Sequence, residues 1–278
     1  MGNRIGVCSW SLRPGDPAEL ARAVSELELG ALQLALDPLR RGEWNLAEVG
    51  EELERHALTI ASGMMEAHGE DYSTLESIRK TGGFVPDEHW ERNLEAATAN
   101  ARLARELDLD LVSLHAGFLP EDEGPERTKL IERLRAIAQR FSDHGVRIAL
   151  ETGQEDAQTL ALFLEELNEK SIGVNFDPAN MILYDKGDPV LALDQLAPHV
   201  FQVHIKDATK TKQPGTWGAE VPAGTGEVDW SAFFACLRRH NLDVDLMIER
   251  EAGEERLKDI LTARKLVEGE LSKKKETE

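Results

Sequence analysis

The sequence predicts an α/β fold of the (β/α)8, or TIM, barrel class, built as a single domain. Eight short apolar runs alternate with amphipathic segments, a pattern typical of buried parallel strands connected by helices. The 278 residues also suit this fold, for which ~250 residues are typical. No glycine-rich phosphate fingerprint follows the first apolar run, so a doubly wound sheet is the weaker alternative.

The predicted strands are the short apolar runs bounded by polar loops. They are expected at Ile5–Trp10, Ala31–Asp37, Leu58–Met65, Leu111–Gly117, Arg147–Gly153, Ile172–Asp177, Phe201–Asp207 and Asp245–Arg250. The predicted helices are the amphipathic segments between and after them. They are expected at Pro17–Leu29, Leu46–His56, Glu88–Leu107, Pro125–His144, Asp156–Leu167, Asp188–Leu196, Trp230–Asn241 and Glu254–Leu271.

No linker rich in Pro, Gly or Ser divides the chain. We therefore expect one barrel domain over residues 1–271 and a charged tail over residues 272–278. Two connections are long, at 67–87 and at 208–229. In a barrel both leave the carboxyl face, where sites are built, so we expect lids or walls of a site there. Capping the barrel or meeting a partner subunit is the alternative.

The composition of the chain limits the classes of partner that we expect. The net charge of −20 argues against nucleic acid and anionic membranes, and a solvated surface is its simplest meaning. No apolar run reaches the ~18 residues of a membrane span, and the N-terminus lacks the features of a signal peptide. Cys8 and Cys236 form no pair motif. We therefore expect a cytoplasmic protein with a small-molecule ligand.

Four residues at the ends of predicted strands indicate a metal site: Glu151, Asp177, His204 and Glu249. They close the runs VRIALE, IGVNFD, VFQVH and DLMIE. Because side chains alternate along a strand, their apolar neighbours face the helices and these four face the barrel axis. Three converging carboxylates without a cation would repel one another and have raised pKa values. With the histidine they form an oxygen-rich ligand set for one divalent metal ion.

The same alternation turns further polar side chains toward the axis. Among them are Gln33, Ser113, His115, Asn175 and Lys206. Each residue taken alone also has a structural explanation. His115 could be a satisfied core histidine, and Lys206 could be the ion-pair partner of Asp207.

Six segments of the chain resemble a known family, the xylose isomerase-like barrels of the sugar phosphate isomerase and epimerase group. They are GVCSWS, VSLHAG, ALETG, GVNFDPAN, QVHIKDA and MIERE, and the loop PAGTGEVDW adds to them. This group includes tagatose and psicose 3-epimerases, hydroxypyruvate isomerase and inosose dehydratase. The resemblance covers nearly the whole chain. It implies one divalent ion (Mn, Mg, Co or Zn) held by Glu151, Asp177, His204 and Glu249.

The resemblance implies an isomerase or epimerase that acts on a ketose or related keto-polyol through an enediolate. Glu151 and Glu249 would be the acid–base pair, one removing a proton and the other returning it. Return to the opposite face gives epimerisation, and return to the neighbouring carbon gives isomerisation. Loss of a β-hydroxyl instead would give a metal-dependent dehydratase of the inosose dehydratase type, which is the alternative.

Five further side chains are candidates for binding the substrate. His115 and Lys206 could hydrogen-bond its oxygens, and Trp10 and Trp217 could pack on the apolar face of a sugar, although a core or lid role is as plausible. Asn180 stands where the tagatose and psicose 3-epimerases carry a histidine. The resemblance therefore names the chemistry and leaves the sugar open.

Two other functions fit the barrel less well. Endonucleases that repair abasic DNA use more metal ions and more histidines, and the charge of this chain is wrong for DNA. A non-catalytic binding protein would not need the four intact ligands. Homodimers and homotetramers are common in the family and are expected here on that ground.

Overall fold

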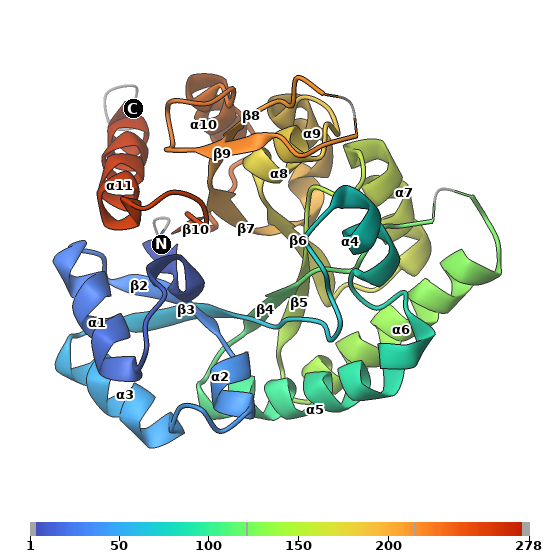
Figure 1. Ribbon diagram of the computed structural model, residues 1–278, viewed down its shortest axis with the longest axis horizontal. Coiled ribbons are helices and arrows are strands. Elements are labelled where there is room, and N and C mark those ends of the chain that lie inside the picture. The colour runs from blue at the N-terminus through green and yellow to red at the C-terminus, as the bar shows by residue number, and fades with distance from the viewer. Residues whose placement is uncertain (1–3, 121, 214, 274–278) are drawn as a thin grey trace.

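The eight apolar runs form one closed parallel barrel in the computed structural model, with helices around it (Figure 1). The structure describes residues 4–120, 122–213 and 215–273. Around the barrel the strand order is β1-β10-β7-β6-β5-β4-β3-β2. The predicted (β/α)8 barrel is therefore confirmed. Residues 274–278 of the predicted tail lie outside the described residues.

The barrel strands match the predicted runs but end earlier. They are β1 (Ile5–Cys8), β2 (Ala31–Ala35), β3 (Thr59–Met64), β4 (Leu111–Leu114), β5 (Arg147–Glu151), β6 (Ile172–Phe176), β7 (Val200–Ile205) and β10 (Asp245–Ile248). The first prediction was too long because the chain turns into a 3-10 helix at Ser9–Leu12, so Trp10 lies outside the strand.

The helices of the described residues surround the barrel or cross its carboxyl end. They are α1 (Pro17–Glu26), α2 (Asp37–Arg40), α3 (Leu46–Arg55), α4 (Leu75–Thr81), α5 (Trp90–Glu106), α6 (Pro125–Ser142), α7 (Ala157–Leu167), α8 (Pro178–Leu183), α9 (Pro189–Leu196), α10 (Trp230–Arg239) and α11 (Arg256–Ser272). Three short ones, α2, α4 and α8, were not predicted. Too few residues make up each of them for a periodic apolar pattern to emerge.

Aspartate side chains fix where four of the predicted helices begin. Asp16, Asp156, Asp188 and Asp229 each accept a hydrogen bond from a backbone N–H in the first turn of α1, α7, α9 and α10. An N-cap of this kind stabilises a helix by ~1 kcal/mol. These caps explain why the helices start at the positions that the sequence pattern indicates.

The interior has two layers of different chemistry. The large apolar side chains pack between the strands and the helices, and Phe141, Phe163 and Phe233 are fully buried there. A second, small cluster consists of Cys8, Ala31, Ala61 and Met247. Gly6 makes room beside it, since a Cβ at that position would lie 2.8 Å from the sulfur of Met247. Polar residues occupy the axis above this cluster, at the carboxyl ends of the strands.

Both long connections carry secondary structure of their own. The segment 67–87 contains α4, and the segment 208–229 belongs to a two-stranded antiparallel hairpin of β8 (Asp207–Thr209) and β9 (Ala219–Val221). The hairpin packs against α8 at the carboxyl end of the barrel (Figure 1).

One buried carboxylate, that of Asp207, organises the loop after this hairpin. Its oxygens accept hydrogen bonds from the backbone N–H groups of Gly224 (2.8 Å), Gly226 (3.1 Å) and Val228 (3.2 Å), and from the indole of Trp230 (3.0 Å). A Cβ at position 226 would lie 2.1 Å from an Asp207 oxygen, so only glycine fits. The GTGEVDW segment is thus the partner of the aspartate in HIKD.

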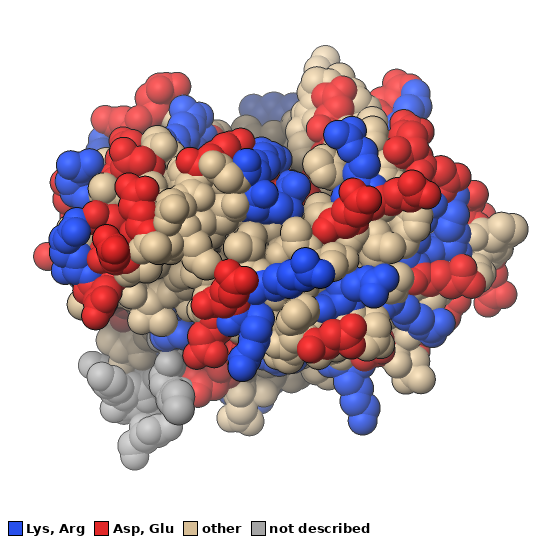
Figure 2. Space-filling view, turned by 90° about the horizontal axis from the view of Figure 1, so that it is seen from below, with Lys and Arg blue, Asp and Glu red and all other residues tan. Residues whose placement is uncertain are grey.

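The outer surface carries charges of both signs. On the face seen in Figure 2, Lys and Arg side chains lie among Asp and Glu side chains. Elsewhere on the surface, charged side chains also form exposed pairs, such as Lys80 with Glu76 and Lys258 with Glu255, which contribute little to stability. Among the described residues, no helix has both the length and the hydropathy to cross a membrane.

Replacing Asp207 with Asn should destabilise the barrel. The amide that replaces the carboxylate has one acceptor oxygen fewer, so some of the N–H donors of the loop lose their acceptor. We expect this loss to lower the free energy of unfolding by ~2 kcal/mol. We expect the melting temperature to fall on the order of 5 °C, measured by circular dichroism. The matched control is Asp229→Asn, which keeps a good N-cap and should melt close to the wild type. Equal melting of both variants would contradict the role of Asp207.

Candidate metal centre

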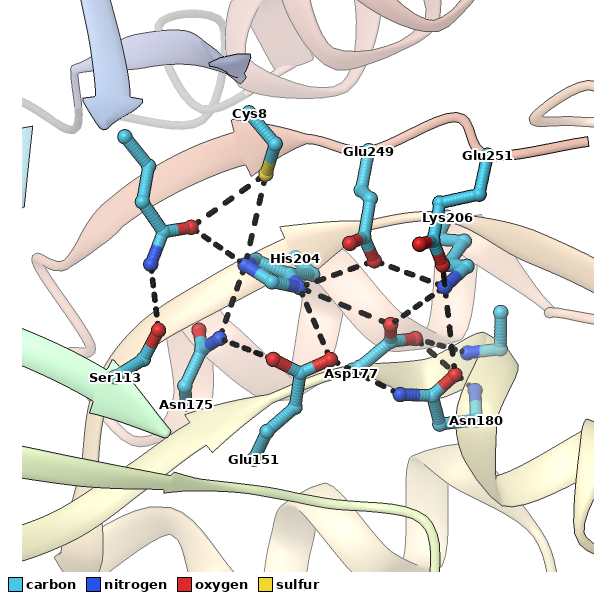
Figure 3. A network of polar contacts seen from close by, with 12 residues as sticks. Cys8, Ser113, Glu151, Asn175, Asp177, Asn180, His204, Lys206, Glu249 and Glu251 are labelled. Carbon is cyan, nitrogen blue, oxygen red and sulfur yellow. Dashed lines mark hydrogen bonds and ion pairs between the residues drawn. The ribbon is translucent and has the colours of Figure 1, made fainter. Parts of the chain in front are cut away.

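The four predicted ligands meet at the carboxyl ends of neighbouring strands. Glu151 ends β5, Asp177 follows β6, His204 lies in β7 and Glu249 follows β10. One ligand atom from each of the four lies within 4.8 Å of the others, and all four residues are buried. Figure 3 shows the three carboxylates around the imidazole of His204.

In this cluster, Oδ2 of Asp177 and Nδ1 of His204 lack a hydrogen-bond partner, and Oε2 of Glu249 forms an ion pair with the ammonium of Lys206 at 2.9 Å. Nδ1 lies 3.8 Å from the Asp177 oxygen, 3.3 Å from that of Glu249 and 3.5 Å from Oε1 of Glu151. Buried polar atoms without partners are costly, and a cation among them would satisfy all of them together. The donor set, three carboxylates and one imidazole, fits a divalent metal ion.

Neighbouring groups hydrogen-bond the three carboxylates. The indole of Trp10 donates to Oε1 of Glu249 at 2.6 Å, and the amide of Asn180 donates to Oε1 of Glu151 at 3.0 Å. Asp177 accepts from two backbone N–H groups with Oδ1 and so caps α8. Each ligand is thereby oriented before any ion binds, which lowers the cost of ordering the site.

Gln33 determines which nitrogen of His204 faces the cluster. Its amide nitrogen donates to the hydroxyl of Ser113 (2.7 Å) and the carbonyl of Gly63 (3.3 Å), so its oxygen must point the other way. That oxygen lies 2.7 Å from Nε2 of His204, which therefore carries the proton and donates it. Nδ1 is left to bind a metal ion.

The charges of the cluster are strongly coupled. Burial disfavours the imidazolium, but Cys8 and the surrounding carboxylates raise the pKa of His204 well above its usual value. Burial disfavours the charged carboxylate too, yet Lys206 and His204 lower the pKa of Glu249 well below its usual range. Burial raises the pKa of Asp177. Metal binding would replace a proton on His204 and add a second cation near Asp177, whose Oδ2 lies 3.8 Å from the ammonium of Lys206.

Lys206 is part of this network. Its ammonium lies 2.9 Å from Oε2 of Glu249 and 2.7 Å from Oε2 of Glu251, and both acids raise its pKa well above the usual value against the effect of burial. The alternative of an ion pair with Asp207 is wrong. Asp207 instead accepts hydrogen bonds from the loop at 224–230, while Lys206 points to the cluster.

A cavity of about 710 Å³ opens beside the cluster. All five predicted substrate-binding side chains line it: Trp10, His115, Asn180, Lys206 and Trp217. Nε2 of His115 lies 3.9 Å from a Glu151 oxygen, and its Nδ1 has no hydrogen-bond partner. Trp10 and Asn180 also hydrogen-bond the candidate metal ligands Glu249 and Glu151. The part of all five side chains in binding a substrate stays a prediction.

Several residues of the cavity were not predicted from the sequence. Glu251 follows Glu249 by two positions in MIERE, and the alternation along a strand could have indicated that it faces the same side. Tyr72 and Tyr184 are the two tyrosines of the chain, and both line the cavity. Their placement in the segments after the third and sixth strands was the available signal. The contacts of Gln33 with Ser113 and His204 join distant parts of the chain, so only the folded barrel shows them.

Residues 18–268 match the model of the family described as xylose isomerase-like TIM barrel. The chain is 31% identical over 125 residues to the uncharacterised protein YihM of Escherichia coli (strain K12). That match covers 43% of this chain and only 38% of YihM.

Two solved structures extend the likeness to the whole barrel. The xylose isomerase domain protein of Planctomyces limnophilus is 28% identical, covers 98% of this chain and 99% of its own, and has a TM-score of 0.89. An L-ribulose 3-epimerase is 18% identical, covers 99% of this chain and 96% of its own, and has a TM-score of 0.75. At that identity, the second likeness concerns the fold.

Substitution of Gln33 should weaken metal binding. Gln33→Leu removes the acceptor that orients His204, so we expect Mn²⁺ to bind about 10- to 100-fold more weakly in calorimetric titrations. Gln33→Glu keeps an acceptor facing Nε2 and should retain most of the affinity. Circular dichroism of both metal-free variants checks the fold. Wild-type affinity in Gln33→Leu would contradict the assigned role.

Proposed function

The chain belongs to the xylose isomerase-like TIM barrel family, and we propose that it is a divalent-metal-dependent isomerase or epimerase of a ketose or related keto-polyol. The convergence of Glu151, Asp177, His204 and Glu249 carries the proposal, together with the buried Oδ2 of Asp177 and Nδ1 of His204, which make no hydrogen bond. The similar fold of an L-ribulose 3-epimerase supports it. The metal would be Mn, Mg, Co or Zn.

Two glutamates flank the site on opposite sides. Glu151 and Glu249 come from β5 and β10, which β6 and β7 separate, and Figure 3 shows them on either side of His204. A divalent ion, when bound, would polarise the substrate carbonyl and stabilise the negative charge of an enediolate. One glutamate would remove the proton from the adjacent carbon, and the other would return a proton from the opposite face.

The neighbours of the two glutamates tune these roles. Lys206 and His204 keep Glu249 ionised, so it is able to accept a proton. Asn180 and His115 approach Glu151 from the side of the cavity, at 3.0 Å and 3.9 Å from its oxygens. Burial of all these groups except the half-buried His115 excludes water, which strengthens the electrostatic interactions in the site.

A dehydratase remains the second candidate. Loss of a β-hydroxyl needs a proton donor at the leaving oxygen, and the cationic Lys206 lines the cavity. The metal ligands would serve this reaction unchanged. The products separate the two functions, because a dehydratase forms an unsaturated or deoxygenated product and an epimerase does not.

The charges of the cavity favour an uncharged substrate. Seven carboxylates and two cations line it, so the negative sign dominates even with a divalent ion bound. Neither cation is free, because Lys206 pairs with Glu249 and Glu251, and Arg41 lies 3.2 Å from Glu66. A phosphate or carboxylate group on the substrate would meet like charge.

Replacing Glu249 with Gln should stop proton transfer. The variant keeps the size of the side chain but cannot accept a proton, so we expect at least a ~100-fold loss of solvent deuterium incorporation into a panel of ketoses. Mass spectrometry measures the incorporation. Elemental analysis should find one metal ion per wild-type chain and less in the variant.

The matched control is Glu255→Gln, an exposed carboxylate paired with Lys258 outside the cavity, which should exchange like the wild type. Unchanged exchange in Glu249→Gln would exclude the acid–base role. A wild-type protein that gains no thermal stability from added Mn²⁺, Mg²⁺, Co²⁺ or Zn²⁺ would exclude the metal centre.

Sugar phosphates should bind more weakly than the corresponding free sugars. For the metal-loaded protein we expect D-fructose 6-phosphate to bind roughly tenfold more weakly than D-fructose, because like charge opposes its entry. Calorimetric titration measures both affinities. Raising the salt concentration should reduce the difference between the two affinities, because salt screens the repulsion. Tighter binding of the phosphate would show that the cavity selects anions.

A further inference from the structure

One wall of the cavity is a face of α8 that leads away from the metal ligands. Asn180, Leu183 and Tyr184 line the cavity, at the spacing that puts residues on one side of a helix. Asp177 caps the start of α8, and Tyr184 at its end lies seven residues further, or about 10 Å along the axis. The cavity therefore continues beyond the reach of a single sugar ring at the ligands.

The far end of this wall is aromatic. The rings of Tyr184 and Trp217 meet edge to face, with centroids 4.7 Å apart, and both side chains line the cavity. Phe118 packs behind Tyr184, with ring centroids 5.9 Å apart. Aromatic rings offer flat apolar faces with polar edges, a surface that suits the apolar side of a sugar ring.

This aromatic wall is held rigidly. The backbone N–H of Gly218 donates to the carbonyl of Leu183 at 3.1 Å, which ties the segment of Trp217 to the end of α8. A Cβ at position 218 would lie 2.6 Å from the carbonyl oxygen of Thr209, so the backbones approach closely there. A ligand would meet a surface already in place, which reduces the cost of binding.

We propose that Tyr184 and Trp217 form a second subsite that binds an uncharged ring attached to the keto sugar. The substrate class is then a ketose that carries a second ring, such as a keto-disaccharide. The assignment rests on the proposed function, which puts the ketose unit at the metal ligands. The volume of about 710 Å³ suits such a ligand, since it lies in the upper half of the ~300–1,000 Å³ range of small-molecule sites.

Keto-disaccharides that share a fructose unit test the subsite directly. Calorimetric titration of the Mn²⁺-loaded protein would compare D-fructose with maltulose, isomaltulose and lactulose, which differ from it only by the second ring and its linkage. We expect at least one disaccharide to bind about five- to tenfold more tightly than D-fructose. Trp217→Leu should remove this advantage, so that no disaccharide binds more tightly than D-fructose, while Trp217→Phe should keep part of it.

Trp44→Leu is the matched control, because Trp44 lies outside the cavity lining; it should keep the wild-type preference. Circular dichroism and Mn²⁺ affinity check that each variant is folded with its centre intact. Equal binding of D-fructose and all three disaccharides, or an advantage that survives in Trp217→Leu, would overturn the subsite alone. Failure of every ketose to bind or exchange would overturn the proposed function as well.

Discussion

The mutual repulsion of three buried carboxylates is the constraint on which the site depends. Two like charges about 4 Å apart repel by roughly 4 kcal/mol at an effective dielectric constant of about 20. One oxygen from each of Glu151, Asp177 and Glu249 lies within 4.8 Å of the other two and of the imidazole of His204. Their arrangement requires positive charge, which His204 and Lys206 supply in part and a divalent ion would complete.

The residues that orient the ligands come from different elements of the barrel. Trp10 after β1 holds Glu249, Gln33 on β2 orients His204, and Asn180 on α8 holds Glu151. Parallel strands bring all of these ends to one face, where short helices and the β8–β9 hairpin complete a cavity. The barrel therefore holds the mutually repelling carboxylates in fixed positions. Catalysis by stabilisation of a developing charge requires charged groups that are oriented in advance.

Local patterns predicted the strands, the long helices and the four candidate ligands, because each depends on residues adjacent in sequence. The apolar run before Glu249 is enough to predict a strand there, with the side chain of Glu249 facing inward at its carboxyl end. The same patterns predicted strands that were too long, as at Trp10. A strand ends where its hydrogen bonds to the neighbouring strand stop, and an apolar run does not show that point. They also missed α8, whose start depends on the side chain of Asp177.

The sequence by itself determined the (β/α)8 class, the eight strands and the set of residue types suited to a metal ion, since side-chain alternation and apolar periodicity are local. Only the tertiary structure decided how those residues are connected. Lys206 pairs with Glu249 and Glu251 rather than with its neighbour Asp207, and Gln33 selects the nitrogen of His204 that faces the ligands. Contacts of this kind join residues that are far apart in the sequence, as in the hydrogen bond between Trp10 and Glu249, which are 239 positions apart. They cannot be predicted from local patterns because barrel closure determines which strand ends meet.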